Sequence, residues 1–167
     1  MIIIHLHEVN NVTQEIYDQM IEEIDLLLLT CPHCGHTGTT VHAYYDRGVK
    51  NNGEYFRLVI LRVECSFCGK THAILPDTLV PYSTITMQDT VDIILSETPE
   101  RVDEILSRNI LLNLSDIYHI RDRYRKYWKE RLASFNIVIN QSISKNCIHQ
   151  FNRQFMQIRC TLCGGYW

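Results

Sequence analysis

Two short cysteine motifs place the strongest constraint on how this chain can fold. One is Cys31-Pro32-His33-Cys34-Gly35 and the other is Cys65-Ser66-Phe67-Cys68-Gly69. In each motif both sulfurs can point to one side of a tight turn, and the glycine can take the positive φ angle that ends the turn. Two such knuckles can supply four thiolates in a tetrahedron, which is the ligand set of a closed structural zinc site. The sequence therefore predicts one zinc ion bound by Cys31, Cys34, Cys65 and Cys68.

The segment between the knuckles is predicted to form a β-hairpin. Residues 39–46 and 54–64 are rich in β-branched and aromatic side chains, and Asn51-Asn52-Gly53 lies between them as a turn. A hairpin returns the chain to the place where it began, so the two knuckles would meet at its base. This arrangement is a zinc ribbon.

Three other uses of these cysteines fit the sequence less well. A thioredoxin-like redox site needs one Cys-x-x-Cys within a βαβ pattern, whereas this chain has two, each followed by glycine. Structural disulfides suit a secreted chain, but residues 1–5 show no basic region and no cleavage site, so we expect no export. A zinc deaminase would pair Pro-Cys-x-x-Cys with an upstream His-x-Glu, and no such partner is present.

Charge is distributed unevenly along the chain. The net charge of the 167 residues is −3, and 46% of them are hydrophobic, as in a globular protein. Residues 1–30 carry six acidic side chains and no Lys or Arg, whereas residues 121–167 carry nine basic side chains and two acidic ones. The longest apolar run, residues 26–29, is too short to span a bilayer, so we expect no membrane contact and a cytoplasmic location. The basic last third is a candidate surface for nucleic acid.

The N-terminal segment is predicted to add a strand and a helix to the ribbon. Residues 1–6 are apolar and β-branched, which favours a short strand. Thr13 is a candidate N-cap for an amphipathic helix over residues 13–25, and residues 26–30 look like a buried strand that leads into the first knuckle. Four cysteines already complete the ligand set, so the nearby histidines are expected at the surface: His33, His36, His42 and His72.

Three helices are predicted after the ribbon. Residues 86–97 hold apolar side chains at helical spacing, and Thr98-Pro99-Glu100 has the N-cap and first-turn proline of a second helix. Residues 109–113 break the pattern, and Ser115 is the expected cap of a longer helix from Asp116 to about Asn136. Two short helices, a turn and a longer capped helix are typical of a helix-turn-helix unit.

The third predicted helix carries the candidate DNA contacts. Basic side chains alternate along it with tyrosines and a tryptophan, and its first turns would lie where base edges are usually read. An ordinary solvated helix, with arginine stems lying over an apolar stripe, is the alternative. The candidate DNA-binding residues are Ser115, Tyr118, His119, Arg121, Arg123, Arg125, Lys126 and Lys129.

The C-terminal residues suggest a second, weaker metal site. Cys147, Cys160 and Cys163 need a fourth ligand, and His149 is the nearest candidate, which gives a Cys3His set. Cys-x-His is an uncommon spacing, so the alternative interpretation is that one member of this pair is a core residue and not a metal ligand. A further alternative is a knuckle that binds metal weakly or only together with a partner chain.

Residues 31 to about 132 resemble the zinc ribbon and helix-turn-helix found at the N-terminus of many bacterial insertion-sequence transposases and in their short relatives on mobile elements. The resemblance rests on the first knuckle and on the segments 60–65 and 75–83. The whole chain is similar to a Gram-positive bacterial family of unknown function, in which residues 151–159 also have a counterpart. The knuckle from Cys160 to Cys163 departs from that family, so the second zinc does not follow from the resemblance. The implied role is DNA recognition within a mobile element.

Together these features predict an α+β protein in three parts: an N-terminal strand–helix and zinc ribbon (1–82), a helix-turn-helix unit (83–136) and a C-terminal zinc knuckle (137–167). We expect two zinc ions, double-stranded DNA as the main partner, and a role as a transposition accessory factor or regulator beside a transposase or another mobile-element protein. The zinc is expected to be structural, so the chain is not expected to be an enzyme. The alternative function is an adaptor that docks a protein partner through its ribbon without reading DNA.

Overall fold

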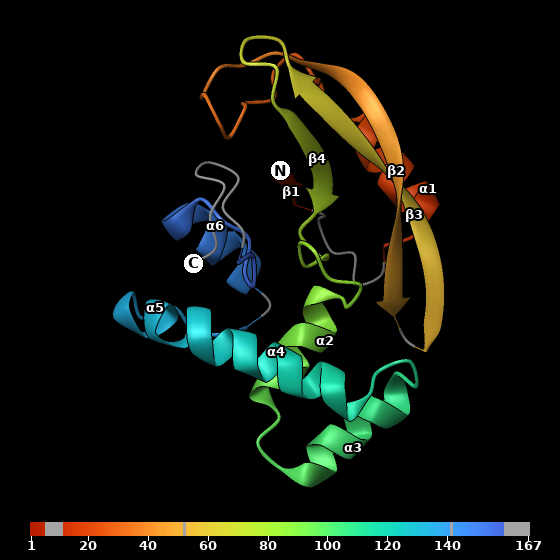
Figure 1. Cartoon of the computed structure of the whole chain (residues 1–167), viewed down its shortest axis with the longest axis vertical. Coiled ribbons are helices and arrows are strands. Elements are labelled where there is room, and N and C mark those ends of the chain that lie inside the picture. The colour runs from red at the N-terminus through yellow and green to blue at the C-terminus, as the bar shows by residue number, and fades with distance from the viewer. Residues whose placement is uncertain (6–11, 52, 141, 159–167) are drawn as a thin grey trace.

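A four-stranded sheet built around the predicted hairpin forms one half of the molecule (Figure 1). The structure, a computed structural model, describes residues 1–5, 12–51, 53–140 and 142–158. Strands β2 (Thr39–Asn51) and β3 (Glu54–Cys65) pair antiparallel, which confirms the predicted hairpin. Strand β4 (Thr71–Pro76) pairs antiparallel with β3, and β1 (Ile2–Ile4) pairs parallel with β4. The strand order is β1-β4-β3-β2.

Strand β2 contains one irregularity that decides which side chains share a face of the sheet. The pairing with β3 shifts by one residue between Val41 and Ala43. Side chains alternate between the two faces of a strand, so one extra residue moves everything after it to the other face. Tyr45 and Arg47 therefore lie on the face of the sheet that carries Arg62, and they would lie on the opposite face without the shift.

Helix α1 (Gln14–Glu22) packs on the sheet and is capped as predicted. The Thr13 side chain accepts a hydrogen bond from the backbone N–H of Ile16 at 3.4 Å, which satisfies one of the free donors of the first turn. The buried side chains of this helix, Tyr17 and Met20, join the hydrophobic core of the sheet.

The hydroxyl of Tyr17 links two strands at the point where their pairing ends. The last paired residues of β3 and β4 in this direction are Arg62 and Ala73. One step further, the backbone N–H of Leu61 donates to the Tyr17 oxygen at 2.9 Å, and the hydroxyl donates to the Ile74 carbonyl at 3.1 Å. The tyrosine hydroxyl thus replaces the next rung of the ladder, so two buried backbone groups keep their hydrogen bonds.

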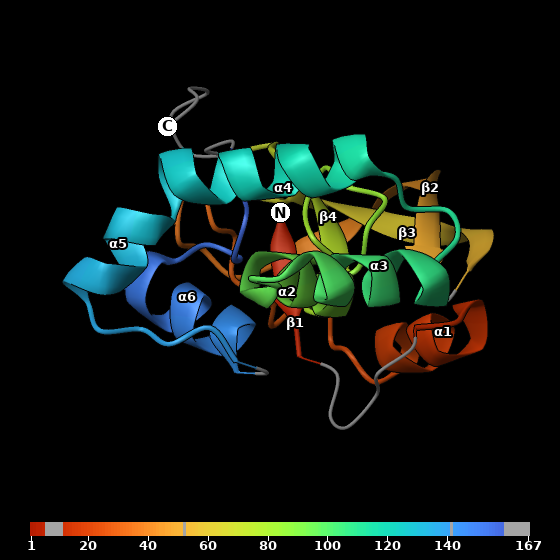
Figure 2. The ribbon, with the colours of Figure 1, turned by 90° about the horizontal axis from the view of Figure 1, so that it is seen from below.

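Helices α2 (Met87–Leu95), α3 (Pro99–Arg108), α4 (Leu114–Tyr127), α5 (Lys129–Ser134) and α6 (Ile143–Phe151) form the other half, around a second hydrophobic core. Figure 2 shows α4 running beside α2 and α3. The predicted cap of α3 is confirmed, because the Thr98 side chain accepts a hydrogen bond from a backbone N–H of the first turn and Pro99 is the first helical residue. Thr86, expected as the first residue of its helix, is the N-cap of α2 in the same way. None of the helices within the described ranges is long and apolar enough to cross a membrane.

Helix α4 (Leu114–Tyr127) does not begin or end as predicted. Its N-cap is Asn113, whose side chain accepts from the N–H of Asp116 at 3.1 Å, while the Asp116 carboxylate accepts from the N–H of Asn113 at 3.2 Å. This reciprocal capping box satisfies two backbone donors, so the prediction of Ser115 as the cap is wrong.

The single long helix predicted up to Asn136 is also wrong. It is interrupted at Trp128, which has φ −124° and ψ −33°, and α5 (Lys129–Ser134) follows. The indole of Trp128 is 1% exposed and packs edge-on against Phe151 and Phe155, at ring distances of 5.9 and 5.3 Å. We attribute the interruption to burial of this ring, a tertiary contact that outweighs local helix preference.

The buried strand predicted over residues 26–30 is not formed. Residues 26–28 are in a turn, and the side chains of Leu27 and Leu28 are 64% and 72% exposed. The Asp25 carboxylate accepts from the N–H of Leu27 at 2.9 Å, and this local hydrogen bond favours a turn over a strand.

Direct contacts join the sheet to the helical half across the predicted boundary at residue 82. The Arg47 guanidinium donates to the carbonyls of Val80 and Ser83 at 2.5 and 2.7 Å. The backbone N–H of Lys50 donates to the carbonyl of Thr84 at 2.7 Å. The Lys50 ammonium also lies 3.4 Å from the Asp116 carboxylate of α4, so polar contacts as well as chain connectivity hold sheet and helices together.

Candidate metal centre

Both knuckles have the same backbone geometry. The N–H of Gly35 donates to the carbonyl of Cys31, and the N–H of Gly69 donates to that of Cys65, each at 2.9 Å. The two glycines have φ angles of +77° and +66°, a conformation that a side chain would strain. The sequence therefore folds into two equivalent turns, as the shared Cys-x-x-Cys-Gly pattern predicts.

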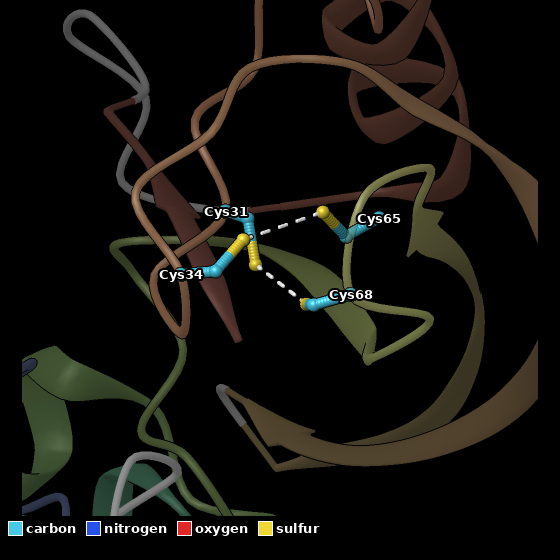
Figure 3. Close-up of side chains that lie close together, drawn as sticks. All are labelled: Cys31, Cys34, Cys65 and Cys68. Atoms are coloured by element: carbon cyan, nitrogen blue, oxygen red, sulfur yellow. Dashed lines mark hydrogen bonds between the residues drawn. The ribbon is translucent and has the colours of Figure 1, made fainter.

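The hairpin brings the two knuckles together, and Figure 3 shows their four cysteine side chains converging on one point. All four sulfurs lie within 4.8 Å of one another. The Sγ atoms of Cys31 and Cys68 are 3.8 Å apart, and those of Cys34 and Cys65 are 3.7 Å apart. A zinc–sulfur bond of about 2.3 Å places sulfurs about 3.8 Å apart at the corners of a tetrahedron, whereas a disulfide bond is about 2.05 Å long. The cluster has free thiols with the spacing that a tetrahedral metal ion such as zinc requires.

Backbone N–H groups and close thiols shape the ionisation of the cluster. Hydrogen bonds from the backbone of Cys68 and then Phe67 help lower the pKa of Cys65 to about 6. The backbone N–H of His36 also lowers the pKa of Cys34, but burial and the three neighbouring thiols together raise it to about 12. The protein alone thus favours the thiolate of Cys65 over that of Cys34. A bound divalent cation would favour the thiolate form of all four cysteines, because it lowers the pKa of every thiol that it binds.

A histidine that was expected at the surface lies directly behind the cluster. His72 on β4 is only 4% exposed, so the prediction of a surface position is wrong. Its Nε2 atom is 3.2 Å from Sγ of Cys31, and its Nδ1 atom is 2.9 Å from the backbone nitrogen of Met1. Burial and nearby positive charge lower the pKa of His72 to about 4, so the ring is neutral. Such a contact can hold a sulfur ligand in place. His72 and the buried Ile74 are two residues apart and so share one face of β4, and this spacing was the sequence signal for the burial of His72.

The second predicted metal site is not assembled within the described residues. Cys147 and His149 both lie on α6, but Cys147 is completely buried in the helical core and His149 is exposed. Two positions on a helix are about 200° apart, so these side chains point to different sides. Burial raises the pKa of Cys147 to about 12, which keeps it a thiol. Its role here is that of a core residue, the alternative noted above. Cys160 and Cys163 lie outside the described residues.

The candidate DNA-binding residues occupy one outer surface, with one exception. Ile117 and Ile120 face the core of the helical half, and the opposite side of α4 with the start of α5 carries exposed side chains. The exposed candidates are Ser115, Tyr118, His119, Arg123, Arg125, Lys126 and Lys129. The Lys126 ammonium pairs with Asp122 at 2.9 Å, one helical turn away, in a partly exposed pair.

Arg121 is the exception. Its guanidinium donates to the Ile93 carbonyl at 3.2 Å and to both the carbonyl and the hydroxyl of Ser96. These are acceptors at the C-terminal end of α2. Arg121 therefore holds α4 against α2, and its charge is not displayed on the outer surface.

These features define a mixed α+β protein with a four-cysteine cluster that could bind a metal ion. Residues 31–108, from the first knuckle to the end of α3, match a domain of unknown function (DUF6431). The match covers less than half of the chain and stops before α4. Comparison with curated proteins and with solved structures found no significant match.

Proposed function

We propose that this protein is a zinc-stabilised DNA-binding protein whose outer α4 surface contacts duplex DNA. The observation that carries the proposal is the exposed side of α4 and α5, which presents Arg123, Arg125, Lys126 and Lys129 together with Tyr118. Basic groups neutralise DNA phosphates, and an amphipathic helix of this length fits the major groove.

The role that we propose for the metal is structural. Four thiolates from Cys31, Cys34, Cys65 and Cys68 would fill a tetrahedral shell and leave no open position for substrate or activated water. Zinc bound there would hold the base of the hairpin closed. The chain would then act by binding and not by catalysis.

We further propose that α3 and α4 act as a helix-turn-helix. Support comes from the tightly held connection between them. The Asn109 side chain is fully buried and donates to Asp89 at 2.9 Å, while Arg108 donates to Asp89 and Asp92 at 2.7 and 2.8 Å. A turn fixed in this way would orient α4 as a rigid reading helix, which a base-contacting element needs.

The position of each candidate residue along α4 and α5 suggests whether it would contact bases or phosphates. Ser115, Tyr118, His119 and Arg123 lie in the first three turns and are the proposed base-reading group, whereas Arg125, Lys126 and Lys129 are the proposed phosphate-contacting group. Lys126 would exchange its Asp122 partner for phosphate. Such exposed pairs contribute little stability, about 0–1 kcal/mol, so the exchange costs little.

We extend the proposal to a transposition accessory factor or regulator in the bacterial cytoplasm, with a transposase or another mobile-element protein as candidate partner. This part rests only on the resemblance of residues 31 to about 132 to mobile-element proteins, because the matched domain has no known function.

The test is the salt dependence of duplex DNA binding, measured by fluorescence anisotropy with the zinc-loaded protein. Each phosphate contact contributes about 0.9 to the slope of log affinity against log salt. A triple alanine variant of the phosphate-contacting group should therefore flatten the slope by about 2.7 and weaken all sequences alike. The matched control removes the same charge from other exposed positions, Arg57, Lys70 and Lys145.

Two outcomes would contradict DNA binding. One is a folded parent protein with no affinity for duplex DNA at low salt. The other is an equal loss in both triple variants, which would mean that total charge and not α4 controls binding.

A protein-binding adaptor is the second candidate function. It is favoured by exposed apolar side chains next to the knuckles: Phe67 is 67% exposed, and its ring stacks on His36 at 3.6 Å, while Leu27 and Leu28 precede the first knuckle. An adaptor would bind its partner with weak salt dependence and would lose affinity on Phe67→Ala and not on changes to α4.

A further inference from the structure

A cavity of about 540 Å³ lies between the sheet and the segment that follows β4. Its wall is formed by Met1, residues 45–48 of β2, Arg62 of β3, residues 71–73 of β4 and residues 82–84. The volume is within the range of small-molecule sites, about 300–1,000 Å³. The cavity is separate from the exposed side of α4, since no residue of that helix lines it.

Two arginines face this cavity because of the register shift in β2. The shift puts Arg47 on the same face of the sheet as Arg62, and both residues line the cavity. Both arginines are half-buried. The sheet thus directs two guanidinium groups into one concave space, where a protein concentrates positive potential.

These two positive charges have no carboxylate partner among the described residues. Arg47 donates to two backbone carbonyls and Arg62 donates to the Thr71 hydroxyl at 2.7 Å, and neither forms an ion pair there. The one acidic residue of the wall, Asp46, has its carboxylate 3.6 Å from the exposed Arg57. Partly buried charges without a counter-ion are costly, and an anion bound in the cavity would compensate them.

One donor of Arg47 is also unused. Its Nε atom is buried and has no hydrogen-bond acceptor within the part of the chain that the structure describes. Buried donors are normally satisfied by protein, water or ligand. A phosphate group, which accepts several hydrogen bonds at once from guanidinium groups, matches the charges of Arg47 and Arg62.

The remaining wall residues point to a ligand with an aromatic part. Tyr45 and Tyr82 supply rings, and Ser83 and Thr84 supply hydroxyl groups beside the arginines. Aromatic side chains stack on nucleobases, and each such contact is worth about 1–3 kcal/mol. We propose that this cavity binds a nucleoside monophosphate, with the phosphate between Arg47 and Arg62 and the base against the tyrosines.

The experiment is calorimetric titration of the zinc-loaded full chain with AMP, GMP, CMP and UMP, with the matching nucleosides and with inorganic phosphate. At least one nucleotide should bind one to one, and its nucleoside should bind at least tenfold more weakly because it lacks the charged group. Arg62→Gln should weaken that nucleotide at least tenfold. Arg101→Gln, the same change at an exposed arginine of α3 that does not line the cavity, should leave affinity unchanged.

Loss of folding is separated from loss of contact by zinc content, urea midpoint and a second variant, Arg62→Lys, which keeps the charge but not the forked geometry. It should bind with intermediate affinity. The proposal is overturned if no nucleotide binds at millimolar concentration, or if Arg62→Gln and Arg101→Gln behave alike. It is also overturned if Arg62→Gln weakens duplex DNA while no nucleotide binds, because the arginines would then belong to the DNA-binding surface.

Discussion

Replacing Tyr17 by phenylalanine removes one oxygen atom and should destabilise the whole sheet. That oxygen accepts from the N–H of Leu61 and donates to the carbonyl of Ile74, and all three residues are at most 1% exposed. The variant leaves two buried backbone groups without partners, and each such group costs about 1–3 kcal/mol. We expect a loss of about 2–4 kcal/mol in the free energy of unfolding. For a chain of this size that corresponds to a melting temperature lower by roughly 5–15 °C.

The measurement is urea unfolding of the zinc-loaded protein, followed by circular dichroism. The midpoint should fall while the slope of free energy against urea stays constant, since the surface exposed on unfolding is unchanged. The matched control is Tyr44→Phe. Tyr44 is 61% exposed, and no hydrogen bond of its hydroxyl is present within the described residues, so this variant should match the parent. If Tyr17→Phe also stays within about 0.5 kcal/mol of the parent, the hydroxyl is not the rung that we describe.

The other predictions concern the metal, pH and the helical contacts. Cys65→Ser should abolish zinc binding and unfold the ribbon, since ligation energy in a small motif is folding energy. Cys147→Ser should keep the zinc content unchanged but lower the free energy of unfolding by about 1–3 kcal/mol, because it places a hydroxyl in an apolar core. Metal analysis that gave the reverse pattern would refute the assignment. Because burial raises the pKa of Cys147 from 9.0 to about 12, the folded state keeps this proton longer than the unfolded state, and stability should fall as pH rises above about 9, by up to about 1.4 kcal/mol per pH unit. Between pH 8 and pH 10 the urea midpoint should therefore decrease less in Cys147→Ser than in the parent protein. Arg121→Gln should lower the melting temperature yet leave the salt slope of DNA binding unchanged, whereas a flatter slope would show that Arg121 itself contacts phosphate.

The features that could be predicted from the sequence are those that depend on a few neighbouring residues. The turn of each knuckle follows from the two cysteines and the glycine. The caps Thr13 and Thr98 follow from a side chain that meets backbone donors three residues on. The convergence of the four cysteines needed one further step, the hairpin, whose turn residues and β-branched strands were visible in the sequence.

The features that could not be predicted depend on contacts between distant residues. Trp128 ends a helix because its indole is buried against α6, which no local pattern announces. Arg121 looks like the other basic residues of its helix, yet it bonds to acceptors 25 and 28 positions away. His72 is buried by the packing of β4 behind the four-cysteine cluster. In each case a side chain with several possible roles received its role from the tertiary fold.

The register shift in β2 also bears on how this hairpin can change in evolution. A substitution near position 42 alters one side chain, but removal of one residue there would turn over the faces of the strand from Ala43 to Asn51. Tyr45 and Arg47 would leave the cavity, and their outward neighbours would enter it. The knuckles would keep their positions, because both lie at the base of the hairpin, on the opposite side of the shift from its turn. Relatives with the same cysteines can therefore differ completely in this cavity by a single insertion or deletion. An alignment of the hairpin should be judged by whether aligned residues point to the same face of the sheet, as well as by residue identity.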